Sequence, residues 1–208
     1  NRLYNLYQSA YTKFHSTETA LLSVYDSLIR ATAKQQVSCL CLLDLSAAFD
    51  TIDHNILLHR LTSWFGISGS ALSWFQSYLS SRSSIVSVSG LKSSSFSSSC
   101  GVPQGSVLGP LLFIMYTTPL SNLISNSPVS HHLYADDTQL YLSFSPNSYT
   151  SNIVQLQSVI AQVSTWMSSN LLSLNPKKTE FLIIGTPQQL SKLNNPALVF
   201  DPNTIITP

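Results

Sequence analysis

The segment LYADDTQLYL spans residues 133–142 and places two adjacent acids, Asp136 and Asp137, between two short runs of apolar and aromatic residues. The flanking runs, Leu133–Ala135 and Gln139–Leu142, have the composition of β-strands. Aspartate favours tight turns because its side chain accepts hydrogen bonds from the nearby backbone. The segment therefore predicts a β-hairpin with both acids at its tip.

A third acid follows a second predicted strand. Val37–Leu43 (VSCLCLL) is almost wholly apolar and ends at Asp44. A continuous apolar run of this length is typical of a strand that is covered on both faces. The alternation places Cys39 and Cys41 on one face of this strand, where we expect buried, reduced thiols.

The rest of the chain interleaves helical and strand-like patterns. Apolar residues recur at helical spacing after Thr17, at Leu21, Leu22, Tyr25, Leu28 and Ile29. One further helix is predicted over 53–65, where Asp53 caps its start and Gly66 ends it. Three more helices are predicted: one over 70–79, one from the end of the loop 101–110 to residue 123, and one over 153–168. Further strands are predicted over 85–88 and 96–100, joined through Gly90, and over 181–184. This order predicts an α+β fold.

The composition excludes several classes of protein. Hydrophobic residues make up 44% of the 208 residues, which is enough for a core and argues against disorder of the whole chain. Charged residues make up only 9%, while serine occurs 38 times. The sequence contains no run of 18 apolar residues, so no membrane span is predicted. The net charge of +1 gives no strong field, which counts against a nucleic-acid partner.

Five of the nine acids fall in two windows, 44–53 and 136–137. Carboxylates at strand ends are costly to desolvate without a cation or a donor. Several oxygen ligands at one edge of a sheet suit a hard divalent ion, above all Mg²⁺. The alternative is that the paired aspartates only cap a turn.

Other catalytic and binding patterns are missing from the sequence. It contains no Asp-Thr-Gly or Asp-Ser-Gly, no GxxxxGK[ST] phosphate loop, no GxGxxG and no Gly-x-Ser-x-Gly. Neither the pair His131-His132 nor the pair His54 and His59 has zinc-ligand spacing. These absences leave the aspartates as the candidate chemistry.

Taken together, the motifs resemble the reverse transcriptases of non-LTR, LINE-like retrotransposons. The resemblance is carried, in family order, by QSAYTKFHSTETALL (8–22), LLDLSAAFDTIDH (42–54), GVPQGSVLGPLLF (101–113), YADDTQLY (134–141) and LNPKKTEFLIIG (174–185). It implies a right-hand polymerase: an antiparallel palm sheet packed on helices, with part of the fingers. The implied division is partial fingers over 1–36, palm over 37–185, and the end of the palm or the start of the connection to the thumb over 186–208.

The resemblance also assigns roles to individual residues. Asp44, Asp136 and Asp137 match the metal-binding carboxylates, which would hold two Mg²⁺ ions, with Mn²⁺ as a substitute. Lys178 matches the lysine near the triphosphate. The matches for nucleotide binding are Leu45, through its backbone carbonyl, Phe49, whose ring excludes a 2′-hydroxyl, and Gln104 and Gly105, which lie under the nucleotide and the template base. The implied reaction is two-metal nucleotidyl transfer.

The implied partners are an RNA template, a DNA primer and deoxynucleoside triphosphates, inside the cell, in the nucleus or the cytoplasm. One residue departs from the family pattern: Thr12 stands where an arginine usually contacts the nucleotide phosphates. The chain begins with Asn1, and we interpret it as an excerpt of a longer protein. The alternatives are a decayed or co-opted, non-catalytic remnant and, as a weaker option, another palm-fold enzyme such as a nucleotide cyclase.

Overall fold

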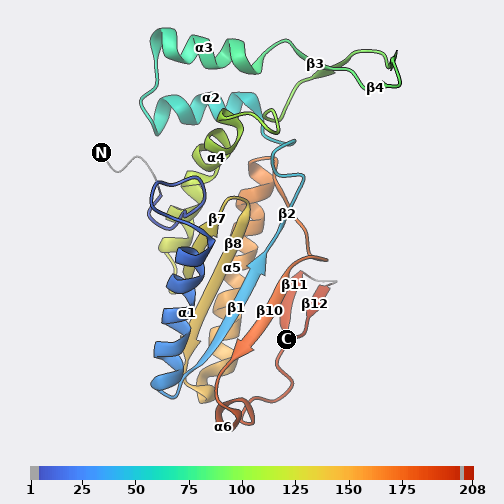
Figure 1. Cartoon of the computed structure of the whole chain (residues 1–208). Coiled ribbons are helices and arrows are strands. Elements are labelled where there is room, and N and C mark those ends of the chain that lie inside the picture. The colour runs from blue at the N-terminus through green and yellow to red at the C-terminus, as the bar shows by residue number, and fades with distance from the viewer. Residues whose placement is uncertain (1–4, 202–203) are drawn as a thin grey trace. The chain divides into compact units, whose positions relative to one another are not determined.

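A computed structural model describes residues 5–201 and 204–208 (Figure 1). The chain forms two compact units: one comprises Ala47–Tyr116, and the other comprises the described residues on either side of that range. These units do not follow the expected boundaries at residues 36 and 185, so the division into fingers and palm stays a prediction. Among the described residues, no helix is both long and apolar enough to cross a membrane.

The unit formed by the residues on either side of Ala47–Tyr116 is built around a four-stranded antiparallel sheet in the order β10-β1-β8-β7 (Figure 1). Its strands are β1 (Val37–Leu43), β7 (Ser130–Tyr134), β8 (Asp137–Phe144) and β10 (Glu180–Ile184). Two-residue strands β2 (Leu45–Ser46) and β9 (Ser173–Leu174) pair with each other, and β11 (Leu198–Asp201) pairs with β12 (Thr204–Ile206). The predicted strands 37–43 and 181–184 are confirmed, and the predicted hairpin around Asp136 is β7 and β8.

Alternation along the strands gives the sheet two different faces. Val37, Cys39, Cys41 and Leu43 point one way from β1, and all four are buried. Their partners on the neighbouring strands, among them Leu140, Phe144 and Phe181, share this face and are buried too. Burial raises the pKa of the Cys39 and Cys41 thiols to about 12, which keeps both protonated and unreactive. The expectation of buried thiols is confirmed.

Helices α1 (Thr17–Ala33) and α5 (Tyr149–Ser169) pack against this sheet (Figure 1). Ser16 caps α1, because its hydroxyl accepts a hydrogen bond from the Thr19 amide while the Thr19 hydroxyl caps the Ser16 amide. The buried stripe of α1 consists of small and medium side chains, Ala20, Val24, Leu28 and Ala31. The larger residues that reveal the helix in the sequence, Leu21, Leu22, Tyr25 and Ile29, are at least half exposed.

The unit Ala47–Tyr116 contains helices α2 (His54–Ser63) and α3 (Gly69–Leu79). Asp53 caps α2 by accepting a hydrogen bond from the Ile56 amide at 2.8 Å, and Gly66 follows the helix with a φ of +67°. Both signals were predicted. The helix predicted after the loop 101–110 is α4 (Leu108–Ser125), and it begins before that loop was expected to end, because Pro110 is tolerated in a first helical turn.

The serine-rich segment of this unit forms a hairpin joined through Gly90, as predicted, but its two arms pair as two separate short ladders. β3 (Arg82–Ser84) pairs with β6 (Phe96–Ser98), and β4 (Ser87–Val88) pairs with β5 (Leu91–Lys92). The predicted strand 85–88 is therefore wrong in its first half. A two-residue turn at Ser89 and Gly90, both with positive φ, fixes the inner ladder, and the outer ladder is offset from it by one residue.

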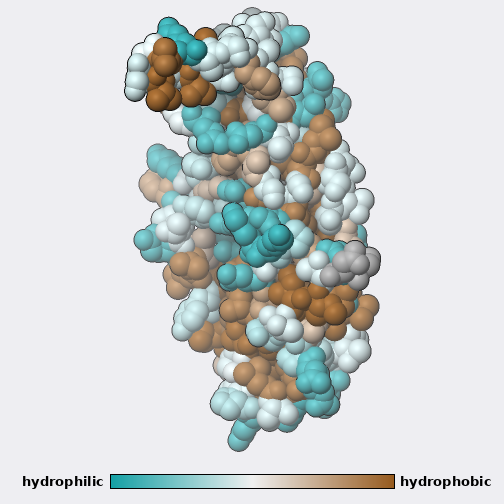
Figure 2. Space-filling view, turned by 90° about the vertical axis from the view of Figure 1, so that its right-hand side faces the viewer, coloured by the Kyte–Doolittle hydropathy of each residue, from teal (hydrophilic) through white to brown (hydrophobic). Residues whose placement is uncertain are grey.

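Large apolar side chains remain exposed in both units. The face of the molecule drawn in Figure 2 shows hydrophobic patches interspersed with hydrophilic ones. The most exposed large apolar side chains include Phe14, Leu91, Phe96 and Val107.

The remaining helices are short: η1 (Pro146–Ser148), a 3₁₀ helix, precedes α5, and α6 (Pro187–Leu190) follows β10.

Candidate active site

Two of the three predicted metal ligands share a cavity at the end of the sheet. Asp44 follows β1, Asp137 begins β8, and both line a cavity of about 220 Å³. The remaining wall is formed by Lys178, Gln139, Glu180, Leu42, Leu43 and Thr138. The structure therefore brings together Asp44, Asp137 and Lys178, which are separated by up to 134 residues in the sequence.

Asp44 is the most enclosed acid of this cavity. Its Oδ2 atom is buried and, within the described chain, accepts no hydrogen bond, although Lys178 Nζ lies 3.4 Å away. The Asp44 carbonyl accepts a hydrogen bond from the Asn175 amide at 2.9 Å, and the Asn175 carbonyl accepts one from the Lys178 amide at 3.2 Å. This chain of backbone contacts holds the lysine over the aspartate. The buried Asp44 oxygen is therefore ion-paired with Lys178, as a carboxylate taken out of water needs a positive charge beside it.

The carboxyl group of Asp137 also lies where negative charge is disfavoured. Asp137 is an exposed residue, but partial desolvation by the surrounding protein raises the pKa of its carboxyl above the usual value. The negative charges of Asp136 and Asp44 raise this pKa further, and the positive charge of Lys178 opposes them. Like charges that share a site disfavour ionisation unless a cation is present. The residues present therefore fit a divalent cation in the chemistry of their donors.

The third acid lies at the tip of the hairpin. Tyr134 pairs with Asp137, so Ala135 and Asp136 form a two-residue turn. The prediction that both acids lie at the tip is wrong for Asp137, which begins β8, because the strand pairing extends one residue further on that side. Asp136 does not line the cavity. Between residues 5 and 201 and from 204 to 208, no three acid, histidine or cysteine side chains are grouped closely enough to hold a metal ion. The metal-ligand assignment stays a prediction.

The turn is held by a residue far away in the sequence. Ala135 has a φ of +55°, which is costly for a residue other than glycine. The side chain of Gln8 accepts a hydrogen bond from the Ala135 amide at 3.0 Å and donates one to the Ala135 carbonyl at 3.3 Å. A parallel bridge between Gln8 and Leu133 fixes the two segments beside each other. Gln8 is thus a positioning residue for the acidic turn.

The residues around Gln8 add to this support. The Ser9 hydroxyl forms a hydrogen bond of 2.9 Å with His132 Nε2, and the ring of Tyr7 lies 4.3 Å from that of His131. Tyr11 lies near the acids: burial raises the pKa of its hydroxyl, and the negative charge of Asp136 raises it further. The Thr12 hydroxyl, in contrast, donates to the carbonyls of its own segment.

The unit Ala47–Tyr116 contains the other predicted site residues. The ring of Phe49 is half-buried and stacks on that of Phe113, with 4.6 Å between their centroids. Gln104 is exposed and donates a hydrogen bond to Asp50 Oδ1 at 3.0 Å, and Gly105 is exposed with a φ of +77°. Leu45 belongs to the other unit, where its side chain is buried and its strand pairs with Leu174. The nucleotide-binding roles of these residues stay predictions.

Sequence reasoning missed three residues near the acids: Gln8, Gln139 and Glu180. Glu180 is paired with Leu42 on β1, two residues before Asp44, and Leu42 is also paired with Gln139 on β8. The Oε1 atom of Gln139 is buried and, in the described chain, has no hydrogen-bond partner. Only the strand register brings these residues together, and the register of distant strands is not visible in local patterns.

Comparison with known protein families decides the identity of the fold. A family model described as "Reverse transcriptase (RNA-dependent DNA polymerase)" matches residues 2–195. The chain belongs to the reverse transcriptase family. Members of this family use divalent metal ions, in agreement with the acids at the end of β1 and at the β7–β8 turn.

The relatives of this reverse transcriptase domain come from mobile elements. It is 30% identical over 180 residues to the RNA-directed DNA polymerase from mobile element jockey of Drosophila melanogaster, which covers 83% of this chain and 19% of the relative. It is 31% identical over 136 residues to the jockey protein of Drosophila funebris, covering 63% and 15%. It is 27% identical over 183 residues to the probable RNA-directed DNA polymerase from transposon BS of Drosophila melanogaster, covering 83% and 19%. The non-LTR type is confirmed, and the chain spans less than a fifth of these relatives.

Solved structures show the fold independently. Apo telomerase from Candida tropicalis, truncated from its C-terminal domain, matches with a TM-score of 0.63 at 13% identity, over 86% of this chain and 36% of that one. Telomerase from Candida albicans in complex with a fragment of telomeric RNA matches with a TM-score of 0.63 at 12% identity, over 94% and 34%. The predicted α+β fold of a polymerase palm with part of the fingers is confirmed, whereas the residue boundaries between the two stay a prediction.

Proposed function

We propose that this reverse transcriptase domain catalyses RNA-templated DNA synthesis. The observation that carries the proposal is the convergence of Asp44, Asp137 and Lys178 on one cavity, with Asp136 at the adjoining turn. The reaction joins the 3′-oxygen of a DNA primer to the α-phosphorus of a deoxynucleoside triphosphate. The bond from the α-phosphorus to the oxygen that bridges the α- and β-phosphates breaks. The hydroxyl proton passes to solvent, and pyrophosphate leaves.

Asp44, Asp136 and Asp137 are the residues that would hold two Mg²⁺ ions, with Mn²⁺ as a substitute. When bound, such ions lower the pKa of the attacking hydroxyl and neutralise the phosphates. Leu45 would contribute its backbone carbonyl to the same site. The protein's own task is to keep these oxygen atoms in place, through the end of β1 and the turn fixed by Gln8.

Lys178 would act on the leaving group. The Lys178 side chain is largely exposed, and its ammonium group is already held beside Asp44. A triphosphate that binds there would replace water around the ammonium group, and the desolvation cost of this step would be small. There the ammonium group can pair with the β- and γ-phosphates, and it can donate a proton to the departing pyrophosphate. Either role makes Lys178 important for the chemical step.

The family resemblance supplies the nucleotide contacts of the second unit. Phe49 would lie against the sugar and exclude a ribonucleotide by steric overlap with its 2′-hydroxyl. Gln104 and Gly105 would lie beneath the nucleotide and the template base, where a residue without a Cβ permits close approach of the backbone. We place this activity inside the cell, where the RNA of a retroelement is found.

The alternative of a non-catalytic remnant is not favoured, because the aspartates, Lys178, Phe49 and Gln104 are all present and the relatives carry the names of polymerases. Template-dependent incorporation tests the proposal. The 208-residue chain, and the longer reading frame around it where one is found, is incubated with Mg²⁺ and an oligo(dT) primer on poly(rA). We expect incorporation of dTTP in preference to dGTP, dATP and dCTP; incorporation that ignores the template would contradict the proposal.

A further inference from the structure

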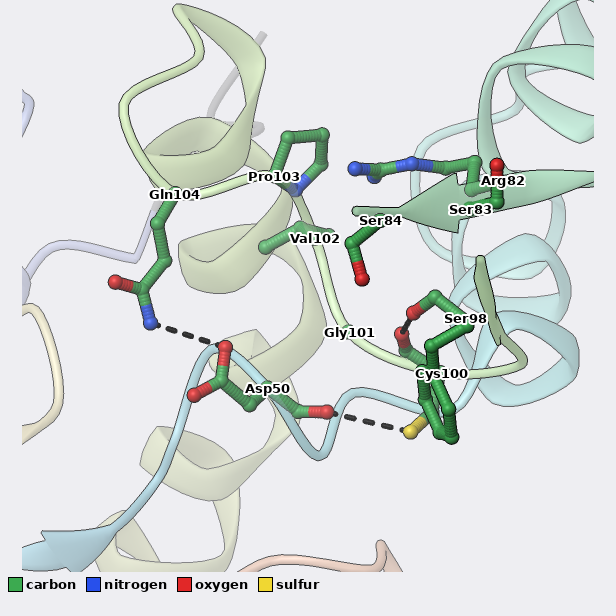
Figure 3. A pocket seen from close by; sticks show the side chains of 11 residues that line it. Asp50, Arg82, Ser83, Ser84, Ser98, Cys100, Gly101, Val102, Pro103 and Gln104 are labelled. Atoms are coloured by element: carbon green, nitrogen blue, oxygen red, sulfur yellow. Dashed lines mark hydrogen bonds between the residues drawn. The ribbon is translucent and has the colours of Figure 1, made fainter. Parts of the chain in front are cut away.

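A second cavity lies entirely within the unit Ala47–Tyr116 and has a volume of about 440 Å³ (Figure 3). Strands β3 and β6 form one side of it, and the loop 101–104 forms the other. Gln104, which we assign to the nucleotide, is part of this lining, but the remaining residues have no role in the proposed function so far.

Both walls of this cavity are fixed by hydrogen bonds. The amides of Gly101 and Val102 donate to the carbonyls of Ile52 and Phe49 at 2.8 and 2.9 Å. A Cβ atom on Gly101 would lie 2.8 Å from the carbonyl oxygen of Asp50, so this loop and the segment 49–54 are packed as closely as backbones allow. The opposite wall is the β3–β6 ladder, in which Arg82 is paired with Ser98. Each wall of the cavity is therefore held in its conformation by its own backbone contacts.

The chemistry of the lining suits a phosphate. The Arg82 side chain extends from β3 across the cavity toward Pro103 (Figure 3), and within the described chain its guanidinium has no hydrogen bond or ion pair. The hydroxyls of Ser83 and Ser84 lie on the same strand as Arg82. A planar guanidinium with adjacent hydroxyl donors pairs well with two oxygens of one phosphate group.

The same lining distinguishes a strand from a free nucleotide. Arg82 and Asp50 are its two charged residues, so their formal charges sum to zero, and the Asp50 carboxylate accepts a hydrogen bond from Gln104. A triphosphate needs more positive charge than one guanidinium, whereas a single phosphodiester does not. Phe96 also lines the cavity and is 72% exposed, which leaves its ring free to stack on a base.

We propose that this cavity binds one phosphodiester of a single-stranded RNA, with Arg82 pairing to the phosphate and Phe96 stacking on a neighbouring base. The inference rests on the proposed function, which supplies RNA as the partner. It adds a contact to the strand that is independent of the acids and of any metal.

The test measures binding rather than catalysis, so a chain that fails to extend a primer can still pass it. A fluorescein-labelled 12-mer RNA is titrated with the 208-residue chain at several salt concentrations, without divalent metal. We expect Arg82→Gln to weaken binding about tenfold or more and to lower the slope of log affinity against log salt by about 0.7, the value for one phosphate contact on a single strand. Arg82→Lys should keep the slope but bind more weakly than wild type.

Two further variants make the result specific. Phe96→Leu should weaken binding about fivefold or more through lost stacking, with an unchanged salt slope. Arg30→Gln is the matched control, because it removes the same charge from an exposed residue of α1 that is paired with Asp26, and it should change neither affinity nor slope. Circular dichroism verifies that each variant is folded.

Three results would overturn the inference. These are no RNA binding by the wild-type chain, an unchanged affinity and slope in folded Arg82→Gln, or an equal loss in Arg30→Gln. Binding of dTTP is measured in parallel: a loss of dTTP binding in Arg82→Gln with unchanged RNA binding would identify a triphosphate site instead. If Arg82→Gln does not fold, the comparison of Arg82→Lys and Phe96→Leu with wild type decides, because the inference predicts weaker binding for both.

Discussion

The side-chain amide of Gln8 forms hydrogen bonds with both backbone groups of Ala135, at 3.0 Å to its amide and 3.3 Å to its carbonyl, across 127 residues of sequence. A third bond, 2.9 Å long, joins the Ala10 amide to the same Gln8 oxygen. Gln8 is 4% exposed, so these bonds do not compete with water. The backbone conformation of the acidic turn therefore depends on one side chain of the N-terminal segment.

Gln8→Ala should lower the free energy of unfolding by about 1–3 kcal/mol, because it leaves the Ala135 and Ala10 backbone groups buried without partners. Urea unfolding measures this change. Gln155→Ala, at an exposed position of α5, is the control and should have an effect within about 0.5 kcal/mol. Equal stability of Gln8→Ala and wild type would show that the turn holds itself.

Phe49 should control sugar selection. Replacing it with valine should relax discrimination against ribonucleotides about ten- to a hundredfold, since the ring no longer occupies the space of a 2′-hydroxyl. The measurement is the ratio of kcat/KM for dTTP to that for UTP in single-nucleotide incorporation. Phe14→Val, at an 87% exposed position, is the control. An unchanged ratio would reduce Phe49 to a packing partner of Phe113.

Thr12 stands where the family usually has an arginine, and its hydroxyl is engaged with its own backbone. Thr12→Arg should lower the KM for the nucleotide about ten- to a hundredfold by adding a charge-assisted contact to phosphate. Lys13→Ala should have little effect, because the Lys13 ammonium lies 4.8 Å above the Phe14 ring. The opposite pattern in steady-state kinetics would mean that Lys13 already supplies the charge.

Acid should destabilise the domain through His131. Burial, and then the neighbouring His132, lowers the pKa of His131 to about 4, and its Nε2 atom forms a hydrogen bond of 2.6 Å with the Ser121 hydroxyl. The neutral ring is favoured in the fold, whose stability is therefore full above the unfolded pKa of about 6.5 and is lost as the pH falls toward 4.

Between pH 7 and pH 5 this residue should account for a loss of about 1–2 kcal/mol in the free energy of unfolding. Urea unfolding at both pH values measures it, and His131→Gln should lose less than wild type over the same interval. His59→Gln, at an exposed position, should keep the full pH dependence. A wild-type loss matched by His131→Gln would refute the assignment.

Local sequence patterns predicted the elements that local chemistry determines. The apolar run 37–43 ends at Asp44, and Asp53 and Gly66 mark the ends of α2. These features were predictable because the burial pattern of a strand and the caps of a helix depend on residues that are close together in the sequence. Periodicity likewise predicted α1 but did not show which stripe is buried. The sheet covers the stripe of Ala20 and Val24, since smaller side chains permit closer packing.

The contacts that were not predicted join segments far apart in the sequence. The pairing of Leu45 with Leu174, the bonds from Gln8 to Ala135, and the position of Glu180 beside Leu42 all depend on strand register. The family resemblance supplied roles for single residues but not the contacts that hold them. For the acids, the sequence predicted a shared site, and the structure places Asp44 and Asp137 in one cavity with Asp136 at the turn.

RNA-templated primer extension by Asp44→Asn and Asp136→Asn measures whether these two acids hold the metal ions of a polymerase. Both substitutions keep size and shape but remove the charge that a divalent ion needs. We expect either one to lower kcat by at least about a hundredfold, since even outer partners of metal ligands contribute about 10–100-fold. Asp26→Asn, at the exposed ion pair of α1, should extend the primer like wild type. Extension at the wild-type rate by folded Asp44→Asn or Asp136→Asn would show that these acids do not hold the metal ions.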